Sequence, residues 1–427
     1  MFAMSGGCMR KLGLGVVLLG LLIFSLLCDN PTESRSNPYE QQPIDWPSLA
    51  DSPWPMYRHD PQLTNRSSYL GPEEGEIVWS YTKPGVKSAK AFTAFAIGSD
   101  STIYFGSSYE PIENRQTWYL YALSPDGNVK WKFRDNKAGI YLMCGPLVTA
   151  EGRIIFGSPE GYVYALNGSG QLSWRYTATG GIYSAVINID KVGNLFFSDN
   201  YGSVYSLDKD GNLRWKIPSN DNFYANDVTA IAISPDGQTI YIANCSFTGT
   251  TLYSISTDGN IKWGYNCGYS TACTFNSPMV DSQGNIYFAL TNSQRDTSVI
   301  GLYSLRSDGT LRWRILGEIN SCSEPTIDWD GNIYVIYGSG NIYSLTNNGE
   351  IRFKIELSDF VTAPLTCDKN NNLYAISDKL YFISSLGSIL TLVNLPSETF
   401  ANPAIDSQGN LYLGAPYGEA NTIVKIR

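Results

Sequence analysis

The chain has 427 residues and a formal net charge of −9; 13% of its residues are aromatic and 16% are charged. The acidic balance excludes a nucleic-acid partner, because phosphate binding needs a basic face and no Lys/Arg cluster follows residue 11. The length exceeds that of one ordinary core and predicts either two domains or a core divided among repeated units. Abundant aromatic residues together with 40 glycines are typical of an all-β chain with many tight turns.

Residues 1–27 are predicted to form an export signal. Arg10 and Lys11 precede an apolar stretch that is shorter than the roughly 20 residues a spanning helix needs. Cys28 follows at once and resembles the cysteine of bacterial lipoprotein signals, which becomes the lipidated N-terminus. This resemblance implies an exported protein of the bacterial cell envelope, periplasmic or surface-exposed, that meets the membrane through its lipid alone. An uncleaved anchor, or ordinary cleavage in the following polar stretch, is the alternative.

Two segments are predicted between the export signal and the first strand of the propeller. Residues 28–51 are expected to be a flexible tether, because their first part has almost no apolar residues. Residues 52–74 contain the chain's one histidine, His59, within SPWPMYRHDPQLTN. A lone histidine needs a partner acid, nucleophile or metal ligands for chemistry, and the repeats specify none. We therefore expect a clasp in which Trp54 and Tyr57 pack on the fold while His59 and Asp60 hydrogen-bond locally.

A repeat dominates the chain after residue 75. Its copies share a Tyr, an Asp-Gly or similar turn, and a strand that ends in an aromatic residue in all but the last copy: YALSPDGNVKW (121–131), YALNGSGQLSW (164–174), YSLDKDGNLRW (205–215), YSISTDGNIKW (253–263), YSLRSDGTLRW (303–313), YSLTNNGEIRF (343–353) and YFISSLGSILT (381–391). The copies end 38 to 50 residues apart. A period of about forty residues is that of a four-stranded propeller blade.

A second turn recurs between these copies, as in DSQGNIYF (281–288) and DSQGNLYL (406–413), so each unit contains four antiparallel strands. The last unit ends after three strands, while residues 75–82 carry an isolated G-x-x-x-W strand. The sequence therefore predicts an all-β, eight-bladed β-propeller over residues 52–427, closed by residues 75–82 as the outer strand of the final blade. Closure leaves only short, protected strand edges.

With these motifs the chain resembles the PQQ-repeat, or quinoprotein-alcohol-dehydrogenase-like, propellers, whose tryptophan-docking motif corresponds to the G-x-x-x-W strand. The resemblance implies that a large aromatic residue fills each blade interface. The docking residues would be Trp79, Trp131, Trp174, Trp215, Trp263, Trp313 and Phe353. The family includes dehydrogenases that bind pyrroloquinoline quinone and calcium, and non-enzymatic lipoproteins such as the barrel-assembly factor of outer membranes. The fold therefore does not settle the function.

The motifs of an enzyme are missing from the sequence. The quinone enzymes of the family imply an adjacent Cys-Cys pair, and no two cysteines are adjacent here. Three turns begin like calcium loops, but none completes the pattern, so we interpret them as solvated turns: Asp208, Asp210 and Asn212; Asp328, Asp330 and Asn332; Asp368, Asn370 and Asn372. We predict no catalytic residue, no cofactor and no metal site.

The cysteines suggest one covalent link. Cys267 and Cys273 lie in one loop, and a disulfide between them is the first expectation for an exported protein. A pairing of either one with Cys245, or buried free thiols, are the alternatives.

Recognition is expected on loops. Residues 107–119, 220–228 and 291–301 form long connections rich in Tyr, Arg, Asn and Asp. The sequence predicts a monomeric, non-catalytic scaffold that binds a protein or glycan partner on its loop face. A PQQ-dependent oxidoreductase with a diverged site and a glycan- or polymer-binding surface protein are the alternatives.

Overall fold

The computed structural model describes residues 37–82, 94–108, 118–135, 145–182, 186–219, 229–246, 249–268, 273–292, 300–316, 322–338, 340–357, 359–361, 363–395, 402–415 and 422–427. The chain divides into two units, Met1–Glu40 and Gln41–Arg427. In the first unit the description covers residues 37–40, where the Glu40 amide donates to the Asn37 carbonyl over 3.1 Å. No helix long and apolar enough to cross a membrane occurs among the described residues.

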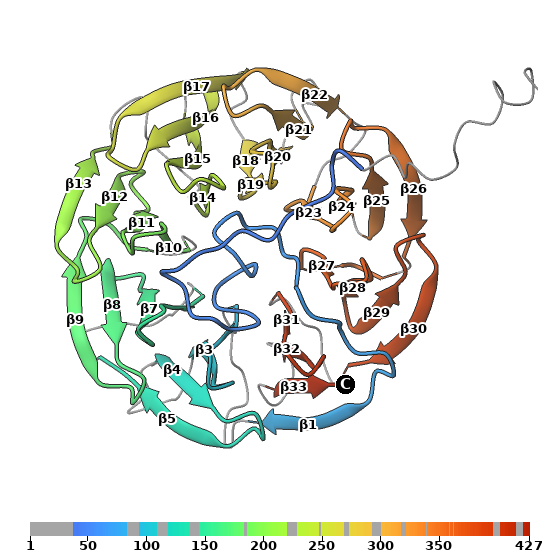
Figure 1. The fold of residues 1–427 in the computed structure, drawn as a ribbon, viewed down its shortest axis with the longest axis horizontal. Coiled ribbons are helices and arrows are strands. Elements are labelled where there is room, and N and C mark those ends of the chain that lie inside the picture. The colour runs from blue at the N-terminus through green and yellow to red at the C-terminus, as the bar shows by residue number, and fades with distance from the viewer. Residues whose placement is uncertain are drawn as a thin grey trace, which may run out of the picture. The chain divides into compact units, whose positions relative to one another are not determined.

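The second unit is a ring of eight antiparallel sheets, each with a two-residue strand near the centre and an outer strand on the rim (Figure 1). The predicted all-β, eight-bladed propeller is confirmed. Blades 1 to 4 contain β2 (Ala96–Ile97), β3 (Ile103–Ser108), β4 (Trp118–Leu123) and β5 (Val129–Phe133); β6 (Leu147–Val148), β7 (Ile154–Gly157), β8 (Tyr162–Leu166) and β9 (Leu172–Thr177); β10 (Asn188–Ile189), β11 (Leu195–Ser198), β12 (Val204–Leu207) and β13 (Leu213–Ile217); β14 (Ala232–Ile233), β15 (Thr239–Ser246), β16 (Gly249–Ser256) and β17 (Ile261–Gly268).

Blade 5 has an inner edge in two pieces, because both its first and second strands pair with its third. Blades 5 to 7 contain β18 (Cys273–Phe275), β19 (Met279–Val280), β20 (Ile286–Asn292), β21 (Gly301–Leu305) and β22 (Leu311–Leu316); β23 (Thr326–Ile327), β24 (Ile333–Tyr337), β25 (Asn341–Leu345) and β26 (Ile351–Glu356); β27 (Thr366–Cys367), β28 (Leu373–Ile376), β29 (Lys379–Ile383) and β30 (Ile389–Asn394).

Blade 8 closes the ring as the sequence predicts. It contains β31 (Ala404–Ile405), β32 (Leu411–Ala415), β33 (Thr422–Ile426) and, from the other end of the chain, β1 (Ile77–Thr82). Strand β1 pairs antiparallel with β33, with Trp79 opposite Lys425. The Arg427 amide also donates to the Glu76 carbonyl over 2.9 Å, so the two ends of the ring are held by main-chain bonds.

The outer hairpin of blades 1 to 7 repeats one turn geometry. The register of the two outermost strands shifts beside this turn, for example between Ser206 and Leu207, and the blade 4 hairpin has a second shift farther from the turn. The turn glycine that follows, Gly211, has φ 85°, a left-handed conformation that glycine adopts without a steric penalty. A type I turn followed by a left-handed glycine and a bulge is the standard three-residue hairpin loop. This explains why all seven copies of the repeat keep the turn glycine.

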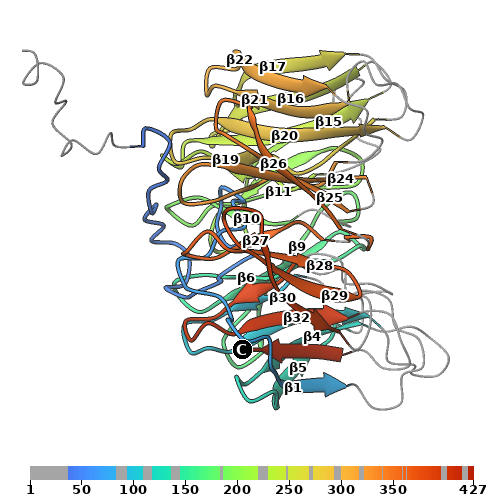
Figure 2. The same ribbon diagram turned by 90° about the vertical axis from the view of Figure 1, so that its right-hand side faces the viewer.

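Residues 41–74, which we name the hub, cross the centre of the ring before β1 begins (Figure 1), and they lie along one face of it (Figure 2). The packed chain begins at Gln41, earlier than the tether predicted to extend to residue 51. The reason is apolar contact: Trp46 and Leu49 are buried in the same core cluster as the inner strands of blades 2 to 5. The Trp46 indole also donates to the Ile189 carbonyl over 2.9 Å.

Candidate functional site

The hub is bonded to the inner strands by its own carbonyl groups. In six blades the amide of the second residue of the inner strand donates to a hub carbonyl, and the acceptors follow one another along the hub in the order of the blades. The donor and acceptor pairs are Ile97 to Trp54, Val148 to Pro55, Ile233 to Pro61, Val280 to Gln62, Ile327 to Thr64 and Cys367 to Asn65, at 2.7 to 3.4 Å. Blade 3 uses a side chain instead, since Asn188 Nδ2 donates to the Pro61 carbonyl over 2.9 Å. The hub therefore satisfies inner-strand donors that no further strand pairs with.

This path requires an unusual backbone. Arg58, His59, Leu63 and Asn65 have φ between 55° and 78°, a left-handed conformation that side chains other than glycine rarely adopt. Each such residue costs on the order of 1 kcal/mol or more and persists only where surrounding contacts fix it. Here the contacts are main-chain bonds. Hub carbonyls before and after these left-handed residues accept from the inner strands of different blades, so the ring holds the hub in one conformation.

His59 lies at the surface of the hub. Its Nδ1 is 3.2 Å from Asp60 Oδ2, and its ring meets the buried Trp54 indole edge-on at 5.2 Å. Asp60 also accepts from the Thr64 amide at 3.0 Å. Although burial alone would raise it, hydrogen bonds from His59 and Thr64 and the charge of Arg66 lower the pKa of Asp60. The local hydrogen bonds expected of His59 and Asp60 are thus present, and they cap a turn of the hub.

The centre of the ring contains a buried ionic group that the sequence did not reveal. The Arg58 side chain is 0% exposed, and its Nη1 is 3.6 Å from Glu324 Oε2. Its Nη2 donates to the Pro325 carbonyl. The Tyr57 hydroxyl donates to the same glutamate over 2.7 Å, and burial followed by the Glu324 charge raises the pKa of Tyr57 well above its ordinary value. Hub and blade 6 are therefore joined by a charge pair as well as by backbone bonds.

One sequence signal marks Glu324. The residues two positions before the inner strands of the eight blades are Ala94, Gly145, Val186, Ala230, Ser277, Glu324, Pro364 and Asn402. Glu324 is the charged member of that set. A charged residue at an interior position where the other blades have uncharged residues needs a buried partner, and Arg58 is that partner.

The three turns whose sequences begin like calcium-binding loops are closed by hydrogen bonds to their own aspartate. In blade 6, Asp328 accepts from the Asn332 amide at 2.7 Å, Asn332 Nδ2 at 2.8 Å and the Tyr334 hydroxyl at 2.8 Å. Blade 7 repeats this arrangement on Asp368. The interpretation as solvated turns was wrong for both carboxylates, which are buried, because each one closes its own turn and accepts a tyrosine. The described residues include no group of three or more His, Cys, Asp or Glu that could hold a metal ion.

The residues at the centre do not fit pyrroloquinoline quinone, the cofactor of the family's dehydrogenases. A cavity of about 290 Å³ adjoins the centre, and its lining includes Tyr57, Glu324 and Asn276. The cofactor carries three carboxylates, whereas Glu324 would place a further carboxylate against it. The described residues that line the cavity include no arginine or lysine, and the Arg58 guanidinium lies beside Glu324. The set of polar groups is therefore of the wrong charge for this ligand.

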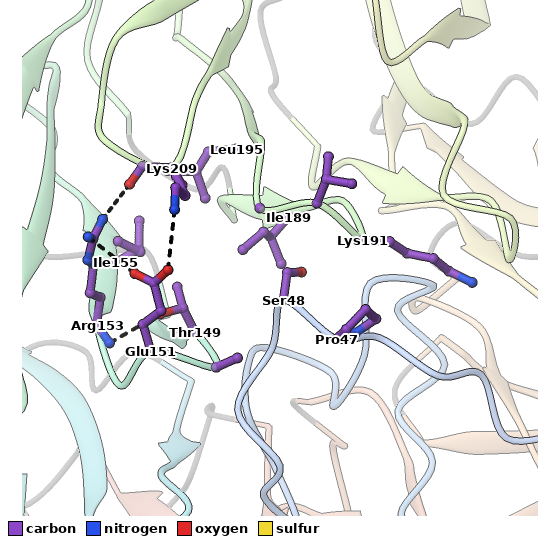
Figure 3. A pocket seen from close by; sticks show the side chains of 13 residues that line it. Pro47, Ser48, Thr149, Glu151, Arg153, Ile155, Ile189, Lys191, Leu195 and Lys209 are labelled. Atoms are coloured by element: carbon purple, nitrogen blue, oxygen red, sulfur yellow. Dashed lines mark hydrogen bonds and ion pairs between the residues drawn. The ribbon is translucent and has the colours of Figure 1, made fainter.

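A cleft opens beside the hub, between blades 2 and 3 (Figure 3). Its volume is about 200 Å³, and its apolar floor consists of the buried side chains Ile155, Ile189 and Leu195. On one rim Glu151 pairs with Arg153 at 3.2 Å and with Lys209 at 3.6 Å. Val192 forms part of the lining and is 77% exposed. An apolar floor with a charged rim is suited to one aliphatic side chain of a protein partner.

The predicted docking aromatics lie at the blade interfaces. Each ring faces the turn glycine of the next blade, so that a Cβ added at that glycine would lie within 3.1 Å of the ring; the pairs are Trp79 with Gly127, Trp131 with Gly170, Trp174 with Gly211, Trp215 with Gly259, Trp263 with Gly309, Trp313 with Gly349 and Phe353 with Gly387. Most of the indoles also donate to a carbonyl of that turn, as Trp215 Nε1 does to Thr257 over 2.9 Å. The glycine is needed because a side chain would displace the ring.

Replacement of one docking ring tests its contribution. We expect Trp215→Ala to lower the free energy of unfolding by about 2 to 3 kcal/mol, less than the 3 to 5 kcal/mol of a fully buried tryptophan, because the ring is half-exposed. Trp215→Phe should lose only about 1 kcal/mol, since it keeps the ring but not the indole hydrogen bond. Urea unfolding of both variants measures this difference. Equal losses would show that the hydrogen bond, rather than the ring, joins the blades.

Several predicted residues lie outside the described residues. They include Cys28, residues 220–228 and most of the other two recognition loops. Cys267 is buried at the end of β17, but the side chains of Cys273 and Cys245 are not described, so the disulfide stays a prediction. Cys322 and Cys367 are buried thiols, and burial raises the pKa of both. Such thiols are poor nucleophiles and pack as small apolar groups.

Comparison with known proteins agrees with this geometry. The sequence matches, over residues 116–320, the family described as outer membrane protein assembly factor BamB. Among curated proteins, none matches the chain in sequence.

The fold is shared with several solved structures. BamB from Moraxella catarrhalis has a TM-score of 0.61 at 13% identity and covers 83% of this chain and 99% of its own. A europium-containing methanol dehydrogenase has a TM-score of 0.65 at 12% identity, covering 85% and 89%. The quinohemoprotein alcohol dehydrogenase from Comamonas testosteroni has 0.61 at 11% identity, covering 87% and 80%. Such low identities show the fold alone. The repeat and the closure by β1, together with the family match over residues 116–320, support a propeller of the PQQ-repeat type.

Proposed function

We propose that this chain is a non-catalytic scaffold of the bacterial envelope that binds a protein partner and is tethered through lipidated Cys28. The observation that carries the proposal is the hub. The chain's own backbone occupies the centre of the ring, and the ionisable groups there, Tyr57, Arg58 and Glu324, are bonded to one another. A reaction at the centre would have to break these contacts. A rigid disc with an accessible surface remains available for binding.

The match to the family described as an outer membrane protein assembly factor supports the envelope and the protein partner. We propose that the cleft between blades 2 and 3 receives an aliphatic side chain of that partner. The cleft combines a buried apolar floor with a charged rim, which is the composition of a contact patch rather than of a glycan site rich in exposed aromatic rings.

Affinity capture tests this function. The full chain is expressed with its own N-terminus in its source bacterium, and proteins cross-linked to it in the envelope are compared with those cross-linked to Val192→Glu. We expect a defined set of envelope proteins with the unaltered chain and its loss in the variant, because a carboxylate would then stand at the apolar cleft. Leu172→Glu is the control, since Leu172 is an exposed aliphatic residue on β9, outside the cleft lining.

Two outcomes would contradict the proposal. The first is capture of the same proteins by the unaltered chain and by Val192→Glu, which would exclude the cleft. The second is reduction of an artificial electron acceptor by the purified protein when pyrroloquinoline quinone, calcium and an alcohol are supplied. That result would establish the oxidoreductase alternative in place of the scaffold.

A further inference from the structure

Two cysteines lie on strands that meet across the interface of blades 4 and 5. Cys245 is the next-to-last residue of β15, and Cys273 is the first residue of β18. Strand β18 is one of the two pieces of the inner edge of blade 5, and it lies beside β15 of blade 4. The main chain of these two strands therefore determines how close the two cysteines are.

The two cysteines are at nearly the same level of the ring. Strands β15 and β20 are the equivalent strands of blades 4 and 5, and their shared Ile-Tyr aligns Cys245 with Thr291. Cys273 pairs with Asn292, the residue after Thr291. One residue of an antiparallel strand advances by about 3.4 Å, so the levels of Cys245 and Cys273 differ by about that distance.

Cys273 belongs to the face of blade 5 that packs on blade 4. Successive residues of β20 alternate between the two faces of the sheet. Leu290 is buried in one core cluster with β15 and β16 of blade 4, whereas its neighbour Ala289 is buried in another cluster with β24 of blade 6. Asn292 shares the face of Leu290 by this alternation. Its partner Cys273 is on the same face, because paired residues of neighbouring strands share a face.

Cys245 belongs to the face of blade 4 that packs on blade 5. Tyr241, on the same strand, meets the Trp263 ring with 6.0 Å between the ring centres. Trp263 is the docking ring that lies against Gly309 of blade 5, and its Nε1 donates to the Ser307 carbonyl of that turn over 3.0 Å. Cys245 follows Tyr241 by four residues and shares its face. The two cysteines therefore occupy the facing surfaces of neighbouring blades.

The strand order of blade 4 excludes Cys267 as the partner of Cys245. Strand β16 lies between β15 and β17, so Cys267 on β17 is two strand spacings, about 9 to 10 Å, from β15. The Cα atoms of a disulfide are usually less than about 7 Å apart. Because β18 lies beside β15, Cys273 is also nearer to Cys245 than to Cys267. Cys267 itself is a buried thiol at the end of β17.

We propose that Cys245 and Cys273 form a disulfide that joins blades 4 and 5, in place of the Cys267–Cys273 bond expected first from the sequence. The two thiols lose two electrons and two protons as the sulfur–sulfur bond forms. These reduce the disulfide of an envelope oxidoreductase to a dithiol by thiol–disulfide exchange. The disulfide rests on the export that is part of the proposed function, because the cytoplasm keeps thiols reduced.

The disulfide lies on the face of the ring opposite the hub. Blade 5 meets the hub where the Val280 amide donates to the Gln62 carbonyl, and β20 leads from that side to Asn292 at the other face (Figure 2). The hub joins the blades along one face, and the disulfide joins two of them along the other. It also fixes β18, a strand of three residues, at the interface of the two blades.

Tryptic peptides of the unreduced full chain test the bond. After thiols are blocked with N-ethylmaleimide, trypsin gives the peptides 217–262, which contains Cys245, and 263–295, which contains Cys267 and Cys273. We expect mass spectrometry of the chain from its source bacterium to find these two peptides linked. The link should persist in Cys267→Ser, the matched control, and should be lost in Cys273→Ser.

Two results would overturn the pairing. One is a disulfide within the peptide 263–295, which would join Cys267 to Cys273. The other is the absence of any link after the purified chain is treated with glutathione disulfide. A third result separates this proposal from the proposed function: if the chain from the bacterium carries both thiols reduced, whereas glutathione disulfide links them in the purified protein, the export fails and the geometry of the pair holds.

Discussion

A chain that starts at Gly75 will melt on the order of 10 °C below a chain that starts at Gln41. The shorter chain keeps all eight blades and the closing strand β1 but lacks the hub. It loses the buried side chains Trp54, Met56 and Leu63, each worth about 2 to 5 kcal/mol in a core. The sum is on the order of 10 kcal/mol. Unfolding entropy of about 2 cal/mol/K per residue converts this loss into the stated shift.

The inner-strand amides give this loss a second cause. Without the hub, the amides of Ile97, Val148, Ile233 and their equivalents have no protein acceptor, and the charge of Glu324 loses Arg58. We expect the shorter chain to be rescued by a synthetic peptide of residues 41–74, because the hub makes its bonds from one continuous segment. Differential scanning calorimetry of the three samples measures both effects.

The chain that starts at Gln41 also serves as the control for this experiment. It should melt at the same temperature as the full chain, since Met1–Glu40 forms a separate unit. If removal of residues 41–74 leaves the melting temperature unchanged, water satisfies the inner-strand donors and the hub is a peripheral attachment. In that case the hub does not rule out a reaction at the centre of the ring.

The ring could be predicted from the sequence because each blade repeats its own local signals. The Asp-Gly turns, the alternating strands and the docking tryptophans recur at a fixed period, and the same G-x-x-x-W spacing at Gly75 to Trp79 identifies the missing outer strand. These signals act within a few residues of each other. The pairing of β1 with β33 followed from counting strands rather than from any long-range pattern.

The hub could not be predicted in the same way. Its residues are fixed by partners on seven different blades, and no periodic pattern in SPWPMYRHDPQLTN reveals such contacts. Trp46 and Leu49 were assigned to the tether because the polar residues before them dominate that stretch. His59 drew attention as the one histidine, whereas the buried charge is its neighbour Arg58. Glu324 is charged where the equivalent residues of the other blades are uncharged, and this difference is visible in the sequence. Its partner Arg58 is visible only in the folded ring.

Arg58 and Glu324 will prove strongly coupled in a double-mutant cycle. Arg58→Met leaves the Glu324 carboxylate without its cation, and we expect a loss of about 3 to 5 kcal/mol in the free energy of unfolding, as for one partner of a buried ion pair. Glu324→Gln should cost a similar amount, because it strands the guanidinium. The double variant Arg58→Met/Glu324→Gln should lose much less than the sum, since neither charge then remains unpaired. Urea unfolding at neutral pH gives all four values.

The double-mutant cycle also decides how the hub is held. A methionine replaces the aliphatic part of the arginine side chain, so a small loss in Arg58→Met would mean that packing and main-chain bonds fix the hub without the charge. Arg58→Lys is the matched control: it keeps the charge, but it loses the Nη2 donor to the Pro325 carbonyl. We expect Arg58→Lys to fall between the unaltered chain and Arg58→Met. Additive single losses would contradict the coupling and would leave the main-chain bonds to six blades as the attachment of the hub.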